Sequence, residues 1–134
     1  MSAIARGPFD VTLTPQASDP SPDGVTLGRL SLEKRYHGEL EAVARGEMLS
    51  VGTPVQGSAT YVAVERVTGT LHGRRGAFAL HHVGVMERGA AQLAVEVVPG
   101  SGTGELAGLA GRMEIAVDGP HHRYTLEYEL PLGA

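Results

Sequence analysis

The chain has 134 residues and a mass of 14.0 kDa, which favours one domain spanning residues 1–134. Hydrophobic residues make up 42% of it, charged residues make up 19%, and the net charge is -4; these values argue against an intrinsically disordered chain and against a nucleic-acid partner. The absence of cysteine excludes disulfides and cysteine-ligated metal centres. No run of about 18 apolar residues predicts a membrane span, and the first residues lack the pattern of a secretory signal, so we expect a cytoplasmic protein without a membrane partner.

In the first half of the chain, apolar and polar residues alternate with the period of two that is typical of β-strands. Strands are predicted over residues 9–14, 25–36 and 39–51. Residues 15–24 hold three prolines, two aspartates and two serines, a composition that predicts a mobile loop. The alternation changes phase at Gly28-Arg29, which predicts a β-bulge at these two residues.

In the second half, residues 58–67 are apolar on both faces, which predicts a strand covered on both sides. Further strands are predicted over residues 77–87, 91–98, 113–117 and 124–130, with turns at 73–76 and 119–122. Residues 103–109 predict one short helical turn, because Thr103 is a suitable N-cap and Glu105 would lie in the first turn. Flanking glycines confine this helical turn, or a compact loop in its place, to residues 100–111.

About eight short strands, with turn signals roughly every 8–12 residues, are typical of a β-sandwich or a β-barrel. No long segment has a helical period, so folds that alternate strands and helices are excluded. Closure into a barrel would remove exposed strand edges, which matters in a chain with few lysines to protect them. An eight-stranded barrel is just wide enough to be filled by side chains or to hold one small ligand.

Residues 61–84 and 98–111, together with Tyr124-Thr-Leu-Glu-Tyr128, resemble an uncharacterised bacterial family of domains of unknown function with an allene oxide cyclase-like barrel. The segment Gly102-Thr-Gly-x-Leu-x-Gly108 is also similar to a loop of allene oxide cyclases and plant dirigent proteins. The resemblance implies an all-β fold, an eight-stranded antiparallel β-barrel that is often oligomeric. It implies no activity, and no motif here matches the catalytic residues of the cyclases, so none of those residues is carried over.

Two neighbouring charged residues, Glu65 and Arg66, interrupt the most apolar strand of the chain. Alternation sends them to opposite faces, so one of them points into the barrel, and the pattern alone does not say which. The inward one is an acid, base or ligand anchor if the site is functional, and a member of a structural ion pair if it is not. Because an ionisable group in a core needs a partner, we predict a contact between Glu65 and His82, or between Arg66 and a carboxylate.

His82 shares one face of its strand with Phe78, Leu80 and Met86, so it is predicted to point inward, either as a proton donor and acceptor or as a hydrogen-bonded core residue. Tyr61, Tyr124 and Tyr128 either line a cavity or fill the core with their hydroxyls near the rim.

No metal is expected at His121-His122, because adjacent residues in a turn point apart. No cofactor motif is present, since Gly100–Gly104 lacks the ending of a phosphate-binding loop.

These patterns favour binding of a small apolar or amphipathic molecule in or at the mouth of a barrel. An isomerase or cyclase that acts on a reactive apolar substrate by acid–base chemistry is the first alternative, and a packed barrel that serves as a structural or interaction module is the second. We also predict a homo-oligomer, most simply a dimer, because two strands are apolar on both faces and only one face can point inward. The N-terminal segment or residues 15–24 could instead cover the outer apolar face.

Overall fold

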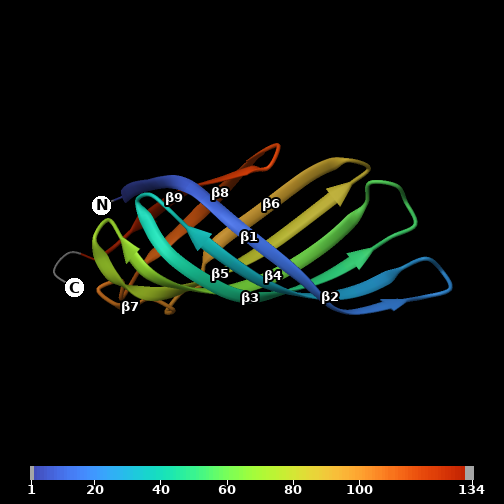
Figure 1. Cartoon of the computed structure of the whole chain (residues 1–134), viewed down its shortest axis with the longest axis horizontal. Helices are drawn as coiled ribbons and strands as arrows, with labels where there is room; N and C mark the ends of the chain where they lie inside the picture. Colours follow the sequence, from blue (N-terminus) through green and yellow to red (C-terminus); the bar gives the residue numbers. More distant parts are fainter. Residues whose placement is uncertain (1, 132–134) are drawn as a thin grey trace.

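The alternating segments form nine strands in the computed structural model, which describes residues 2–131. They are β1 (Ser2–Pro20), β2 (Thr26–Tyr36), β3 (Leu40–Gly52), β4 (Ala59–Leu71), β5 (Arg74–Glu87), β6 (Ala90–Val97), β7 (Thr103–Gly104), β8 (Ala110–Asp118) and β9 (His121–Glu129). The sheet has the order β4-β3-β2-β1-β9-β8-β6-β5-β7, and β4 also pairs with β5. Eight antiparallel strands therefore close a barrel, as predicted, while the two residues of β7 add to β5 (Figure 1).

One end of the barrel, here called the closed end, holds most of the core. The start of β1 and the end of β9 lie near it (Figure 1). Inward side chains of eight strands form this core, including Tyr36, Leu40 and Phe78, each at most 2% exposed. Leu106 and Leu109, from the connection between β6 and β8, are buried against the same core and cap this end.

The opposite end, here called the open end, is less well closed because the strands differ in length. β6 pairs with β8 through only Val95 and Glu96, so the start of β6 and the second half of β8 are not paired with each other. β1 likewise pairs with β9 only as far as Phe9, and its second half extends with β2 alone. Strands β1–β5 consequently project beyond the β8–β9 hairpin (Figure 1).

The predicted loop over residues 15–24 is wrong for its first six residues, which continue β1 to Pro20. Two of the prolines fit because this half of β1 pairs only with β2, so its other edge has no ladder hydrogen bonds to lose. The predicted bulge at Gly28-Arg29 is also wrong, since β2 pairs without interruption with β3. The irregularity lies across the ladder, between Pro15 and Ala17 of β1.

Residues 103–109 form no helix, and the part of the chain that the structure describes has no helix long and apolar enough to cross a membrane. Thr103 begins β7, and tight turns follow, with backbone bonds from Leu106 to Thr103 and from Leu109 to Leu106. The predicted compact loop against one barrel end is therefore present, without the helical turn. The polar turn predicted at 73–76 is tighter than expected, because only His72 and Gly73 separate β4 from β5, both with positive φ.

Candidate functional site

Apart from tyrosines, the inner face of the barrel carries three buried ionisable side chains among residues 2–131, Lys34, Glu65 and His82. They come from β2, β4 and β5, each at an inward position of the alternation. Between β2 and β4 runs β3, whose inward residues at this level are Ala44 and Gly46. Because these residues are so small, the side chains of Lys34 and Glu65 can meet across the intervening strand.

Glu65 is the centre of this group, which we call the central cluster and define as Lys34, Tyr36, Glu65 and His82. Its Oε2 atom accepts hydrogen bonds from Lys34 Nζ at 2.8 Å and from the His82 ring nitrogen Nε2 at 2.6 Å. Its Oε1 atom accepts the hydroxyl of Tyr36. Lys34 Nζ also lies 5.1 Å from the ring centroid of Phe9, within the range of a cation–π contact.

The central cluster stabilises the charge on Glu65. Burial by itself would raise the pKa of Glu65, but the hydrogen bond from His82 and the charge of Lys34 outweigh burial and hold that pKa below its usual range. Burial, followed by the nearby charge of Glu65, raises the pKa of Tyr36 well above its ordinary value. The cluster therefore combines a charged carboxylate with a tyrosine that keeps its proton.

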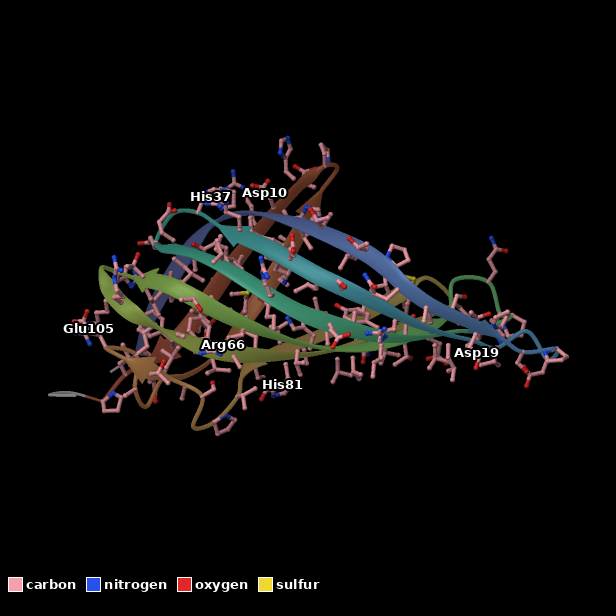
Figure 2. All side chains as sticks on the ribbon, turned by 60° about the horizontal axis from the view of Figure 1, so that its bottom comes forward. Asp10, Asp19, His37, Arg66, His81 and Glu105 are labelled. Carbon is pink, nitrogen blue, oxygen red and sulfur yellow. The ribbon has the colours of Figure 1, made fainter. Side chains whose placement is uncertain are left out.

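The predicted contact between Glu65 and His82 is confirmed, and Glu65 is the inward member of its pair. Arg66 points outward from β4 (Figure 2) and does not take part in the cluster. His81, the neighbour of His82, also points outward, 3.9 Å from Glu96.

The three candidate tyrosines lie in different places. The Tyr124 hydroxyl accepts from the Leu40 backbone nitrogen and donates to the His37 carbonyl, which fastens the turn between β2 and β3 at the closed end. The Tyr128 hydroxyl bonds the His72 ring, whose other nitrogen is 3.2 Å from Glu39. Both of these tyrosines hold strand ends together and are remote from the open end. Only Tyr61 lies toward it.

At the open end the inner face forms a hollow of about 330 Å³ with predominantly apolar walls, here called the mouth cleft. It is lined by Met48, Ser50, Ala59, Thr60, Tyr61, Gly84, Val85, Met86, Ala91, Gln92 and Leu93. The Tyr61 ring lies across Gly84, where an added Cβ would collide with it, so the glycine makes room for the ring. Burial and the charge of Glu65 raise the pKa of Tyr61, in keeping with its place beside the central cluster.

The mouth cleft and the central cluster occupy successive levels of the same inner face. Tyr61 is two residues before Ala63 on β4, and Gly84 is two residues after His82 on β5. Ala63 pairs with His82, and Tyr61 pairs with Gly84, so one step along the barrel leads from the cluster to the cleft. An apolar hollow therefore ends beside a buried polar group.

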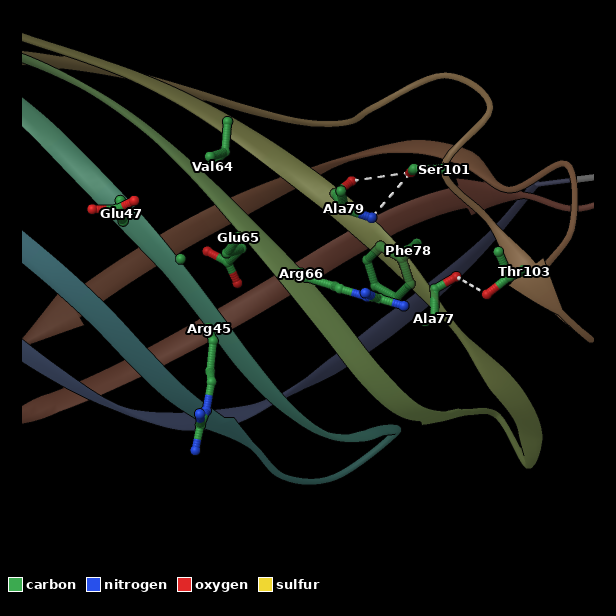
Figure 3. A pocket seen from close by; sticks show the side chains of 11 residues that line it. Arg45, Glu47, Val64, Glu65, Arg66, Ala77, Phe78, Ala79, Ser101 and Thr103 are labelled. Atoms are coloured by element: carbon green, nitrogen blue, oxygen red, sulfur yellow. Dashed lines mark hydrogen bonds between the residues drawn. The ribbon is translucent and has the colours of Figure 1, made fainter.

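A second hollow, of about 410 Å³, lies on the outside of β3–β5 (Figure 3). Arg45, Arg66 and Val64 line it, and the connection before β7 borders it through Ser101, whose hydroxyl is bonded to the backbone of Ala79. Glu65 also belongs to this part of β4, but its side chain is buried on the inner face. This outer groove brings together no candidate residue except Arg66.

Lys34 and Tyr36 were missed as site residues. Lys34 is the only lysine of the chain, and both residues follow Leu30 and Leu32 at alternate positions. This alternate spacing indicates that both side chains point inward. The bulge expected at Gly28-Arg29 left it undecided which residues of the strand face the core. The partnership across β3 could not be predicted, because it depends on Ala44 and Gly46 leaving space. Among residues 2–131 no group of three metal-ligating side chains is found.

A closed eight-stranded antiparallel barrel with a buried polar cluster defines this chain as a small β-barrel protein. The chain belongs to the family described as "Protein of unknown function (DUF3224)", whose model matches residues 5–128. It is similar to a protein of unknown function from the same family of Shewanella oneidensis MR-1, known from a crystal structure, with 47% identity over 98% of this chain and 99% of that chain and a TM-score of 0.92. A comparison with curated proteins finds no match. The resemblance stated from the sequence is confirmed.

Proposed function

We propose that this protein binds a small amphipathic molecule in the mouth cleft, with its apolar body against the cleft walls and its polar end toward the central cluster. One observation carries the proposal: an apolar hollow of about 330 Å³ lies one step along the inner face from buried His82 and two steps from buried Glu65. Ligand sites generally combine apolar walls with a few convergent polar groups. The open end also differs from the filled interior that a purely structural barrel would have.

The size of the cleft suits a ligand of about ten to fifteen heavy atoms. Burial of apolar groups contributes about 0.8 kcal/mol per methylene, so a phenyl ring with a short alkyl chain should bind with a Kd of roughly 10 µM to 1 mM. Suitable probes are 4-propylphenol and 4-propylanisole, which share this apolar body. At ten times Kd, a ligand that binds only the folded state stabilises it by about 1.4 kcal/mol, which raises the Tm of a chain of this length by about 5 °C.

The test compares thermal melting of the wild-type protein, Leu93→Arg and Ile4→Arg with these two probes. Leu93 lines the cleft, and Ile4 lies on β1 outside it, yet their exposed fractions are nearly equal at 43% and 44%. We expect at least one probe to raise the Tm of the wild type and of Ile4→Arg, but not that of Leu93→Arg. The proposal is wrong if neither probe raises the Tm of the wild type, or if Leu93→Arg responds as Ile4→Arg does.

The His82–Glu65 contact also favours a second candidate function, isomerisation of an apolar substrate by proton transfer at His82. A carboxylate that orients an imidazole is a recurrent arrangement in general acid–base catalysis. This activity requires a substrate in the mouth cleft, so the binding experiment tests its precondition.

A cytoplasmic location also stays a prediction, and fractionation of cells that express the tagged protein would test it.

A further inference from the structure

One nitrogen of the central cluster has no partner within the protein. The Nε2 atom of His82 lies 2.6 Å from Glu65, whereas its Nδ1 atom has no hydrogen bond within residues 2–131. In the same part of the chain, no fully buried side-chain nitrogen or oxygen lacks a partner. Nδ1 therefore keeps contact with solvent, which agrees with the 4% exposure of the His82 side chain.

This contact with solvent is on the side of the open end. On the closed side, the next inward residue of β5 is Leu80, which is 0% exposed, and Leu80 pairs with Val97, which is buried. On the open side, the next inward residue is Gly84, which has no side chain and belongs to the wall of the mouth cleft. The remaining exposure of His82 therefore faces the open end and not the core, and the Tyr61 ring over Gly84 separates it from the mouth cleft, so a ligand would reach Nδ1 past the edge of this ring.

Charge balance favours a neutral His82 ring, whose Nδ1 atom can accept a hydrogen bond. The carboxylate of Glu65 accepts, so the hydrogen of the His82 ring is on Nε2. Lys34 already supplies one positive charge against Glu65, and a second positive charge on His82 would leave a buried cluster with a net charge. In the neutral ring, Nδ1 carries a lone pair and accepts a hydrogen bond.

We propose that Nδ1 of His82 accepts a hydrogen bond from the ligand, and that the mouth cleft takes apolar molecules with a hydroxyl donor at one end, namely alcohols and phenols. This inference rests on the proposed binding function. A ligand without a donor would displace water from Nδ1 and leave the nitrogen unpaired, which lowers affinity. A carboxylate ligand would face both the lone pair of Nδ1 and the negative charge of Glu65.

Three probes with one apolar body separate these cases: 4-propylphenol carries a donor, 4-propylanisole replaces it with a methyl ether, and 4-propylbenzoate carries a negative charge. We expect the phenol to bind at least tenfold more tightly than either of the others in calorimetric titrations. Equal affinity for the phenol and the anisole overturns the inference but leaves the binding function intact. Binding by none of the three overturns the binding function itself.

Nitrogen NMR of the wild-type protein reads the contact directly, because each of the six histidines gives its own ring signals. The phenol should move the unprotonated Nδ1 signal of His82 upfield, and the anisole should leave it in place. His82→Phe keeps an aromatic ring without the acceptor, so its preference for the phenol over the anisole should fall to about one. If that variant does not fold, the wild-type spectra decide alone, and an Nδ1 signal that does not respond to bound phenol overturns the inference.

Discussion

Lys34 lies inside the barrel with its ammonium against Glu65 and the ring of Phe9, and its side chain is only 4% exposed. Removing two charges from water costs several kcal/mol per ion, and good geometry is needed to offset this cost. Here the carboxylate has three donors, Lys34, Tyr36 and His82, so both of its oxygens are satisfied. The pair contributes little net stability, but the loss of one member leaves the other charge buried without its counterion.

Lys34→Met tests this balance. We expect it to lower the free energy of unfolding by about 3–5 kcal/mol, because it leaves Glu65 buried without its positive partner. Urea denaturation measures the loss, and Arg29→Met is the control, since the Arg29–Glu47 ion pair is half-exposed and should contribute at most about 1 kcal/mol. Adding Glu65→Gln to Lys34→Met should recover part of the loss. Equal effects of the two single variants would contradict the account.

The lowered pKa of Glu65 gives the folded protein a specific acid sensitivity. The ordinary pKa of this carboxyl is 4.5, so Glu65 contributes stability above that pH, and the contribution is lost as the pH falls through the lower pKa of the folded state. The advantage of wild type over Glu65→Gln in unfolding free energy should therefore shrink between about pH 5 and pH 2. Glu87→Gln, at an exposed strand end, should follow the wild-type curve at constant offset. A constant difference for Glu65→Gln as well would rule out this role.

At the level of single residues, alternation was enough to predict that His82 points inward and that an inward charge on β4 needs a partner. It could not assign the roles of Tyr124 and Tyr128, because their hydroxyl partners are the backbone of the β2–β3 turn and the ring of His72. These partners lie 84 and 56 residues away in the chain. Their proximity is a product of barrel closure, which a local pattern does not contain.

At the level of elements, the connection between β6 and β8 depends on two glycines for different reasons. At Gly102 an added Cβ would collide with the carbonyl oxygen of Leu106, while Gly100 has a φ of 82° and open space around it. Gly102→Val should therefore destabilise the fold by about 3 kcal/mol, since backbone must move, whereas Gly100→Ala should cost only about 1–2 kcal/mol for its left-handed conformation. Thermal melting of both variants measures the difference, and an unchanged Tm in Gly102→Val would contradict it.

Prediction of the strands succeeded where the buried face was continuous and failed at the β1–β2 extension. Residues 15–20 contain two prolines and no apolar alternation, yet they form a strand because β2 pairs with them along one edge only. The pairing of β2 with both β1 and β3 extends the sheet beyond the β8–β9 hairpin. The mouth cleft results from this inequality of strand length, which turn signals alone do not reveal.

At the level of the whole molecule, the outer face of β3–β5 carries exposed aliphatic side chains in register. This outer patch consists of Leu49, Val51, Val62, Val64, Val83 and Val85, all at least 36% exposed. Leu49 pairs with Val62, and Val62 with Val83, so the patch is continuous across three strands. Both alternative covers lie elsewhere, since residues 2–9 pair with β9 and residues 17–20 pair with β2.

The homodimer stays a prediction, and the outer patch is the face through which we expect a second copy to bind. A stable interface needs roughly 800 Å² per partner and an apolar centre, which such a patch can supply. Light scattering at micromolar concentration should give about twice the 14.0 kDa of one chain. Val62→Arg should reduce the mass to that of a monomer, while Val117→Arg, on β8 outside the patch, should not. A wild-type mass near 14.0 kDa that is stable on concentration would exclude the dimer.

The mouth cleft is the centre of the account, and a crystal structure of the protein with bound 4-propylphenol tests it most directly. We expect the ring of the ligand between Tyr61 and Leu93, with its hydroxyl within hydrogen-bond distance of His82 Nδ1. The buried bonds among Lys34, Glu65 and His82 should be unchanged, because the ligand needs only the free nitrogen. A crystal with the ligand in the outer groove beside Arg66, or with ordered solvent alone in the mouth cleft at saturating ligand, would contradict the account.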